Sequence, residues 1–307
     1  MWGFPMNRVS KRLTKGDVTF NIINYMVFIL ITLICVYPFY YIFINTISAN
    51  DLSQGGMILF YPRGIHFDNY SNIIRINGIG QAALISISRT VLATAATIIG
   101  SALLGFLFTK DMWHRKFWYR FLIITMYFNA GLIPWFITMK NLGLTNNFLA
   151  YVLPAIVVPF NIIMVKTYIE STPIALQEAA EIDGAGILKI FSKIVLPLCK
   201  PILATIAIFS AVGQWNSFQD TLILMTDNHL YTLQYILYIY LNQASSLASM
   251  IRQDASNANA ITQAATQITP TSIKLTITMV VVLPVLFVYP FFQKYFAKGI
   301  MIGAVKG

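Results

Sequence analysis

Long apolar runs alternate with short polar segments along the whole chain. Six of the runs reach the length of about 20 residues that a helix needs to cross the core of a bilayer. They cover residues 21–47, 82–109, 118–139, 148–169, 201–225 and 272–296. The pattern predicts an all-α membrane protein with six transmembrane helices in one domain over residues 21–297, between a tail over 1–20 and a tail over 298–307.

The polar segment between the fourth and fifth runs, residues 171–200, has a helical pattern of its own. Thr172 and Pro173 suit the N-cap and the first position of a short helix. Gly184 suits the left-handed turn that ends a helix. A second apolar stripe covers residues 187–195 at the spacing of one helix face. The segment therefore predicts two short helices joined by a bend, which we call the elbow.

Two prolines, Pro197 and Pro201, are expected to end the second helix of the elbow. Small residues form one side of the elbow: Ala179, Ala180, Gly184 and Ala185. Small side chains let a second protein surface approach the backbone closely, so this side is predicted to be a contact surface. An amphipathic hairpin lying on the membrane surface is the alternative; it explains the apolar stripe but not the other motif positions of the segment.

The composition agrees with a membrane protein, because 57% of the residues are hydrophobic and only 10% are charged. In soluble domains about a quarter of the residues are charged. The net charge of +10 does not indicate nucleic-acid binding, since the Lys and Arg residues are not gathered on one polar domain. They concentrate in the N-terminal tail, the connection 110–120, the elbow and the C-terminal tail. This distribution predicts that both termini and the elbow are cytoplasmic.

The sequence contains no pattern that indicates catalysis or a metal site. Cys35 and Cys199 stand alone, and His66, His114 and His229 are far apart in the sequence. A G-x-x-x-x-G-K-[ST] phosphate-binding loop is absent from the sequence. We therefore expect that this chain binds no cofactor of its own.

Polar residues inside the apolar runs are candidates for a translocation path. Asn129 and Asn161 lie in runs that Pro134, Pro154 and Pro159 are expected to kink. An asparagine at such a position is costly against lipid. The two residues are expected either to join helices by hydrogen bonds or to line a water-filled path.

The fifth run is the most polar of the six. Its outer half carries Gln214, Trp215, Asn216, Gln219 and Asp220, which form i, i+4 pairs on more than one face if the helix is continuous. These residues either line a cavity or lie in the interfacial zone of the membrane. Arg89, in the second run, is interpreted as a snorkelling or helix-pairing residue, with substrate contact as the alternative.

The elbow resembles the EAA loop of ATP-binding-cassette (ABC) importer permeases. The matching positions are Glu178, Ala179, Ala180, Gly184, Ile194, Leu196 and Pro197, and the same segment holds Glu181, Asp183, Ala185 and Phe191. Asp183, Ala185, Phe191 and Pro201 resemble the carbohydrate-uptake branch of this family. The end of the chain, Gly299 to Gly307, resembles the C-terminal signature of sugar permeases, and "NAGLIPW" and "LPAIV" resemble complex-oligosaccharide permeases.

The resemblance implies the type I ABC importer permease fold, with the elbow between helices four and five as the loop that couples to an ATPase. The implied partners are a second homologous permease, two cytoplasmic ATPase subunits that bind ATP and Mg²⁺, an extracytoplasmic solute-binding protein and a carbohydrate substrate. The implied location is the bacterial cell membrane. The outer connection 226–271 either reaches the binding protein or is a polar spacer. A permease for a non-sugar solute and a secondary transporter are the alternatives.

Overall fold

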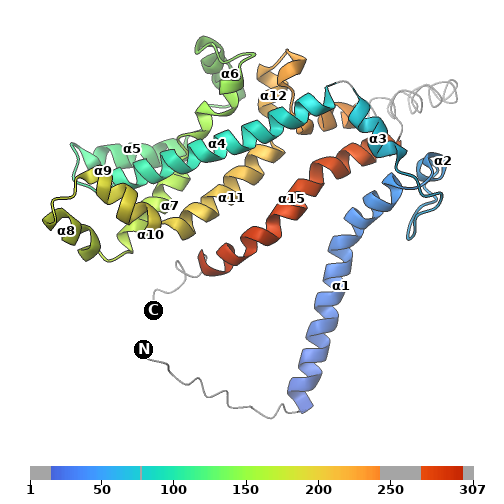
Figure 1. Cartoon of the computed structure of the whole chain (residues 1–307), viewed down its shortest axis with the longest axis horizontal. Helices are drawn as coiled ribbons and strands as arrows, with labels where there is room; N and C mark the ends of the chain where they lie inside the picture. The colour runs from blue at the N-terminus through green and yellow to red at the C-terminus, as the bar shows by residue number, and fades with distance from the viewer. Residues whose placement is uncertain (1–14, 77, 243–270, 300–307) are drawn as a thin grey trace.

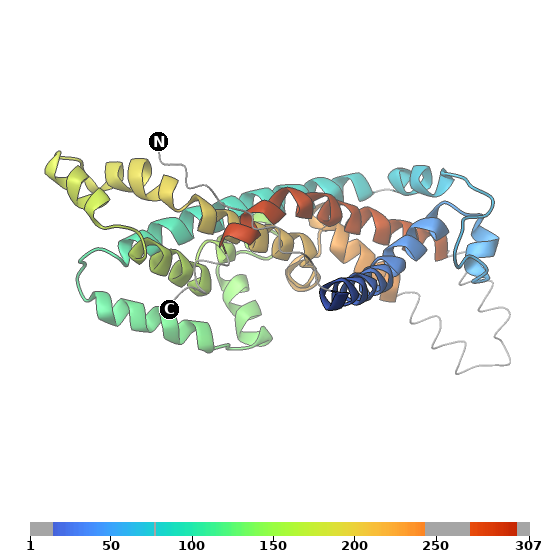
Figure 2. The ribbon, with the colours of Figure 1, turned by 90° about the horizontal axis from the view of Figure 1, so that it is seen from below.

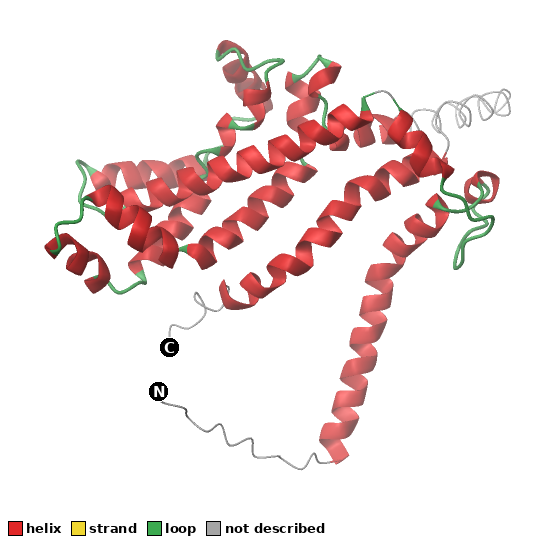
Figure 3. Cartoon of the chain, in the orientation of Figure 1, coloured by secondary structure: helices red, strands yellow, loops and turns green. Residues whose placement is uncertain are grey.

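The computed structural model describes residues 15–76, 78–242 and 271–299, which form helices joined by loops, without a strand (Figure 3). The all-α prediction is confirmed over these residues. The longer helices are α1 (Lys15–Thr46), α4 (Ile79–Leu107), α5 (Arg115–Tyr127), α6 (Leu132–Asn141), α7 (Pro159–Glu170), α11 (Lys200–Asn216) and α15 (Thr271–Gly299). The shorter ones are α2 (Asn50–Gln54), α3 (Asp68–Arg75), η1 (Phe148–Tyr151), η2 (Leu153–Ala155), α8 (Ala175–Ile182), α9 (Ile187–Ile190), η3 (Phe191–Val195), α10 (Leu196–Leu198), α12 (Gln219–Leu224) and η4 (Asn228–Leu230).

Helices α4, α7 and α11 pack together as the centre of the molecule, and α15 lies along α11 (Figure 1). Two glycines of α4 permit its close approach to the segment of η2 and α7. A Cβ atom on Gly100 would lie 2.2 Å from the carbonyl oxygen of Ile156, and one on Gly105 would lie 2.8 Å from Val165. Since only hydrogen fits at these positions, the helix spacing is fixed by the sequence of α4.

Helix α1 is almost entirely exposed along its length and packs only by its C-terminal end, where Ile44, Asn45 and Thr46 are buried. In Figure 1, α1 diverges from the bundle. In Figure 2, α1 is seen nearly end-on, and it lies at a distance from α5 and α6. Most of its exposed side chains are apolar. Because α1 is an apolar helix of 32 residues that the rest of the described protein does not cover, its exposed surface is suited to contact with lipid.

Three helical stretches among the described residues are long and apolar enough to cross a membrane: α1, α4 and Phe148–Glu170. A fourth follows if the bent pair Ile187–Leu198 and Lys200–Asn216 is counted as one span. The axes of that pair differ by 76°. The sequence predicted six continuous crossings, so the tertiary structure differs from the prediction in how several runs are divided.

The predicted helix over residues 118–139 is wrong as a single helix, because α5 ends at Tyr127 and α6 begins at Leu132. The side-chain Oδ1 of Asn129 accepts a hydrogen bond of 2.9 Å from the backbone N–H of Gly131. This local bond competes with the helical backbone pattern, and Gly131 has a φ of 87°. The break is therefore set by Asn129 and Gly131, and not by Pro134.

The predicted helix over residues 201–225 is also interrupted. Helix α11 ends at Asn216, Ser217 is extended, and α12 begins at Gln219. Arg89 donates from Nη1 to the Ser217 carbonyl oxygen at 3.2 Å. A backbone carbonyl freed by a helix break inside a membrane protein needs such a partner. The break also means that Gln219 and Asp220 do not continue the faces of α11, so the expected i, i+4 pairs are wrong.

The first helix of the elbow, α8, begins later than predicted. It starts at Ala175, and its N-cap residue is Ile174. Thr172 donates its hydroxyl back to the Ile169 carbonyl oxygen instead of capping α8. The left-handed conformation predicted for Gly184 is confirmed by its φ of 75°. Pro197 lies inside α10 after a π-helical turn, so it does not end the second helix as predicted.

Three predictions fall partly outside the described residues. These are the N-terminal tail before residue 15, the part 243–270 of the outer connection, and the C-terminal signature after Gly299. The described start of the outer connection contains η4 and a helix over residues 233–242.

Candidate functional site

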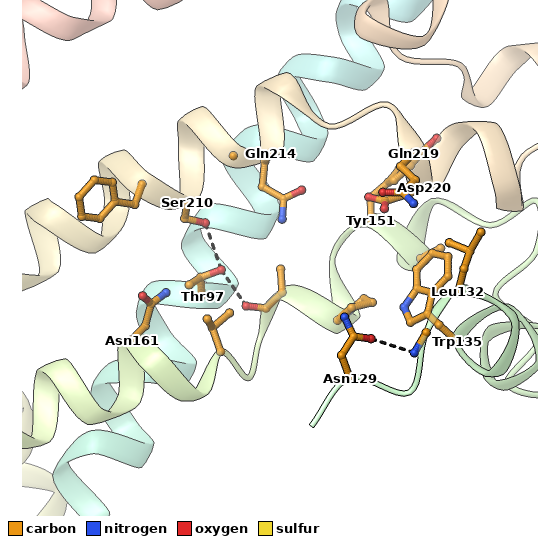
Figure 4. A pocket seen from close by; sticks show the side chains of 17 residues that line it. Thr97, Asn129, Leu132, Trp135, Tyr151, Asn161, Ser210, Gln214, Gln219 and Asp220 are labelled. Atoms are coloured by element: carbon orange, nitrogen blue, oxygen red, sulfur yellow. Dashed lines mark hydrogen bonds between the residues drawn. The ribbon is translucent and has the colours of Figure 1, made fainter. Parts of the chain in front are cut away.

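A cavity of about 700 Å³ lies between α4, α6, η1, η2, α7, α11 and α12 (Figure 4). It gathers side chains from four of the predicted apolar runs. The lining residues are Thr97, Asn129, Gly131, Leu132, Trp135, Ala150, Tyr151, Pro154, Ala155, Val158, Asn161, Phe209, Ser210, Gly213, Gln214, Gln219 and Asp220. Five of the seven predicted path residues are among them: Asn129, Asn161, Gln214, Gln219 and Asp220.

A chain of hydroxyl groups joins the helices at one end of the cavity. Ser210 donates to the hydroxyl of Thr97 at 3.2 Å, and the Thr97 hydroxyl lies 2.7 Å from the Ala155 carbonyl oxygen (Figure 4). These contacts connect α11, α4 and η2. They satisfy the carbonyl of η2 where the prolines of this run prevent a regular helix.

Behind the opposite end of the cavity wall, Arg89 is the centre of a buried hydrogen-bond cluster. Only 2% of its surface is exposed. Its Nε donates to Gln214 Oε1 at 2.9 Å, and its Nη2 contacts Asp220 Oδ2. The guanidinium carbon lies 4.5 Å from the centre of the Tyr151 ring. Together with the bond to Ser217, these contacts join α4 to η1, α11 and α12. The helix-pairing interpretation of Arg89 is confirmed, and snorkelling is excluded by its burial.

Tyr151 completes this cluster of Arg89, Tyr151, Gln214, Ser217 and Asp220, which we call the hub. Its hydroxyl donates to the Leu230 carbonyl oxygen at 2.8 Å and lies 2.9 Å from the Thr221 hydroxyl. Tyr151 is therefore held from both sides, and its ring covers the face of the Arg89 guanidinium. A buried guanidinium whose donors and ring face are occupied costs much less than an unpaired one.

Two predicted path residues lie away from the cavity. Trp215 donates from Nε1 to the Val281 carbonyl oxygen at 2.9 Å, so it joins α11 to α15. Asn216 accepts a hydrogen bond of 3.1 Å from Gln234. Both residues precede the break at Ser217 and lie on faces of α11 that the cavity does not reach.

The cavity also contains residues that the sequence reasoning did not select: Thr97, Trp135, Tyr151 and Phe209. Thr97 had a detectable signal, because Thr90, Thr94, Thr97 and Ser101 recur at helical spacing within an apolar run. The aromatic residues had none, since aromatic residues make up 14% of the chain.

The elbow lies at the end of the bundle where α4 ends and α5 begins (Figure 1). Its outer surface is formed by exposed residues: Glu178, Ala179, Glu181, Asp183 and Gly184. Ile182 is 86% exposed and Leu188 is 73% exposed. Ala180 and Ala185 are half-buried against the chain's own core, so of the four small residues only Ala179 and Gly184 are open to a partner.

The base of the elbow is anchored in the bundle. Phe191 packs on Phe106 of α4 with ring centres 5.2 Å apart, and Leu196 packs against the same buried cluster. Glu181 forms an ion pair of 2.9 Å with Lys110, which follows α4. Ile194 is half-buried and Pro197 is exposed. The elbow thus has a packed base and an exposed tip that carries both carboxylates and the apolar side chains of Ile182 and Leu188.

A bundle of apolar helices with a polar cavity between them and an exposed elbow at one end defines a membrane transport protein. The chain belongs to the family of binding-protein-dependent transport system inner membrane components, whose profile matches residues 98–302. It is accordingly a membrane permease subunit of an ABC importer, and not the ATPase. The family predicted from the elbow is confirmed.

Several proteins are similar to the chain over nearly its whole length. The polygalacturonan/rhamnogalacturonan transport system permease protein of Bacillus subtilis (strain 168) is 33% identical over 94% of this chain and 98% of its own. The arabinooligosaccharides transport system permease protein of Halalkalibacterium halodurans is 29% identical over 91% of this chain and 94% of its own.

A solved structure is similar as well. It is the crystal structure of a bacterial ABC transporter involved in the import of the acidic polysaccharide alginate. The matching chain has a TM-score of 0.79 and 28% sequence identity, and the match covers 92% of this chain and 98% of that one. The predicted type I ABC importer permease fold is therefore confirmed.

Proposed function

We propose that this chain is one of two different permeases that together form the pore of an oligosaccharide importer in the bacterial cell membrane. The observation that carries the proposal is the cavity, whose lining combines amides, hydroxyls and aromatic rings. Sugar hydroxyls both donate and accept hydrogen bonds, and sugar rings stack on aromatic faces, so this lining suits a carbohydrate. The names of the relatives, which refer to oligosaccharide and polysaccharide transport, support the same substrate class.

In this proposal the chain crosses the membrane six times, with both termini and the elbow in the cytoplasm. Helices α5 and α6 form one broken crossing, and α11 and α12 form another. Non-helical backbone at membrane depth is tolerated where it lines a water-filled cavity, and both breaks lie beside the cavity. The remaining partners are two ATPase subunits, which bind ATP and Mg²⁺, and an extracytoplasmic solute-binding protein.

The elbow is the proposed contact for an ATPase subunit. Its tip exposes apolar side chains, Ile182 and Leu188, next to the carboxylates of Glu178 and Asp183. Exposed apolar residues with a polar rim are typical of protein interfaces. Because the base packs against α4 and α11, a displacement of the tip is transmitted to helices that line the cavity.

A substitution of Gly213 tests the path. Gly213 lines the cavity, and a Cβ atom there would have no neighbour within 4 Å. Gly213→Trp is therefore expected to fill the cavity without disturbing the packing and to reduce oligosaccharide uptake to background. Gly213→Ala is the matched control and should transport. Uptake is measured in proteoliposomes of the complete importer, with a panel of oligosaccharides and non-sugar solutes. Normal uptake by Gly213→Trp contradicts the path.

The elbow is tested with two glycines that differ in conformation. Gly184 has a φ of 75°, whereas Gly186 has a φ of −65°, and neither has a neighbour near a Cβ atom. Gly184→Val is expected to cost about 1 to 3 kcal/mol in backbone strain. We expect this variant to stay in the membrane but to lose ATPase docking and substrate-stimulated hydrolysis.

Gly186→Val, which meets no such strain, is expected to retain both. Docking is measured by co-purification of the ATPase, and hydrolysis by phosphate release from the reconstituted complex. Equal coupling in the two variants would contradict a role for the bend.

A further inference from the structure

The loop over residues 55–67, between α2 and α3, exposes a run of large apolar side chains. Arg63 is the one Lys, Arg, Asp or Glu residue in this segment, and its guanidinium lies 4.8 Å from the centre of the Tyr61 ring. An exposed apolar patch of this kind marks a surface that a partner or a membrane covers. Its members are 50% to 69% exposed: Met57, Leu59, Phe60, Tyr61, Ile65 and Phe67.

Loop 55–67 is held against α1. Tyr37 and Tyr40 of α1 donate their hydroxyls to backbone carbonyl oxygens of the loop, at 3.2 Å to Leu59 and 2.7 Å to Phe60. The rings of Tyr37 and Phe60 lie 6.1 Å apart, and the neighbouring Ile58 is fully buried. Figure 3 shows the loop, in green, folded back beside the C-terminal end of α1. The exposed side chains therefore project from a backbone with a fixed place on α1.

The contacts with α1 also give the loop a depth in the membrane. A helix of 32 residues is about 48 Å long, whereas the hydrocarbon core of a bilayer is about 30 Å thick. If α1 is centred, about 9 Å of the helix projects from the core on each side. Tyr40 and Tyr37 lie about 9 and 13 Å before the end of α1 at Thr46. Leu59 and Phe60 are therefore level with the boundary between hydrocarbon and headgroups.

We propose that loop 55–67 inserts into the phospholipid headgroup region of the outer leaflet and fixes the depth of α1. The inference takes only the orientation of the chain from the proposed function and otherwise goes beyond it. Aromatic rings are enriched at this depth, and an arginine there extends its guanidinium to the phosphates while its stem stays among apolar groups. Because α1 packs on the bundle only by its C-terminal end, the loop supplies a second attachment, to lipid.

The test attaches a nitroxide spin label to one position at a time in the complete importer in phospholipid nanodiscs. Cys35→Ser and Cys199→Ala first remove the native thiols. Phe60→Cys is compared with Ser71→Cys, on an exposed face of α3, as the matched control. Power saturation measures collisions of the label with oxygen, which concentrates in lipid, and with a nickel chelate, which stays in water. The ratio of oxygen to nickel collisions is expected to be at least about threefold higher at position 60 than at position 71.

The other possible surroundings of the loop give different results. Few collisions with either reagent at position 60 would mean that protein, such as the second permease, covers the loop, and would contradict the proposal. Frequent nickel collisions would mean that the loop lies in water, which also contradicts it. If those collisions fall when the solute-binding protein is added, the loop docks that protein instead of lipid.

Two further measurements separate this inference from the proposed function. A membrane-impermeant maleimide should label Ser71→Cys from outside intact cells, and no labelling would contradict both the outer leaflet and the proposed orientation. Oligosaccharide uptake is measured with the importer that carries no label. Normal uptake together with water-like or protein-like collisions at position 60 contradicts the anchor alone. Absent uptake together with lipid-like collisions contradicts the proposed function and leaves the anchor in place.

Discussion

Replacing Asp220 by asparagine is expected to destabilise the permease by about 3 to 5 kcal/mol, because the change leaves Arg89 buried without a counter-charge. Arg89 cannot turn to solvent, since only 2% of its side chain is exposed and its other partners hold it between α4 and α11. The loss is measured as a lower Tm of the detergent-purified protein.

The double variant Arg89→Met/Asp220→Asn is the control for this prediction. It removes the buried charge together with its partner, and it is expected to be more stable than Asp220→Asn by about 2 kcal/mol. The recovery stays incomplete because the Ser217 carbonyl oxygen and Gln214 lose their donors. If the single and double variants have the same Tm, the pair does not stabilise the hub.

A second large effect is expected at Gly100. In Gly100→Ala the new methyl group would lie 2.2 Å from the Ile156 carbonyl oxygen, and no side-chain rotation relieves a contact with backbone. The segment of η2 must move away from α4, at a cost of about 3 kcal/mol, and the cavity wall formed by Pro154 and Ala155 moves with it. Both Tm and uptake should fall.

Gly80→Ala is the matched control, since Gly80 is in the same helix and a Cβ atom there has no neighbour within 4 Å. Its free energy of unfolding is expected to change by no more than about 0.5 kcal/mol, as for a neutral surface substitution. Its Tm should therefore be nearly unchanged. Comparable losses in the two variants would show that helix geometry, and not the contact with Ile156, makes Gly100 necessary.

The break in α11 illustrates where sequence reasoning fails. Residues 201–225 form one apolar run with polar residues near its outer end, and a periodic pattern favours a continuous helix. The chain instead departs from the helix at Ser217, where Arg89 supplies the donor that makes the free carbonyl tolerable. Arg89 is 128 residues away in the sequence, so no local pattern could predict the break.

The cavity residues likewise separate into those that the sequence could predict and those that it could not. Asn129, Asn161, Gln214, Gln219 and Asp220 were detectable because a polar side chain in an apolar run is costly unless it faces protein or water. Trp215 and Asn216 lie in the same segment of the fifth run as Gln214 and Asp220, yet their side chains form hydrogen bonds with Val281 and Gln234. Which polar residue lines a cavity depends on the direction of its helix face.

The sequence by itself determined the helical class, the family and the left-handed bend at Gly184, because apolar run length, a spaced motif and the absence of a Cβ atom are local properties. The tertiary structure alone decided the helix breaks, the burial of Arg89 and the membership of the cavity. These features depend on contacts between segments far apart in the chain, in which one segment satisfies the backbone or the charge that another leaves open.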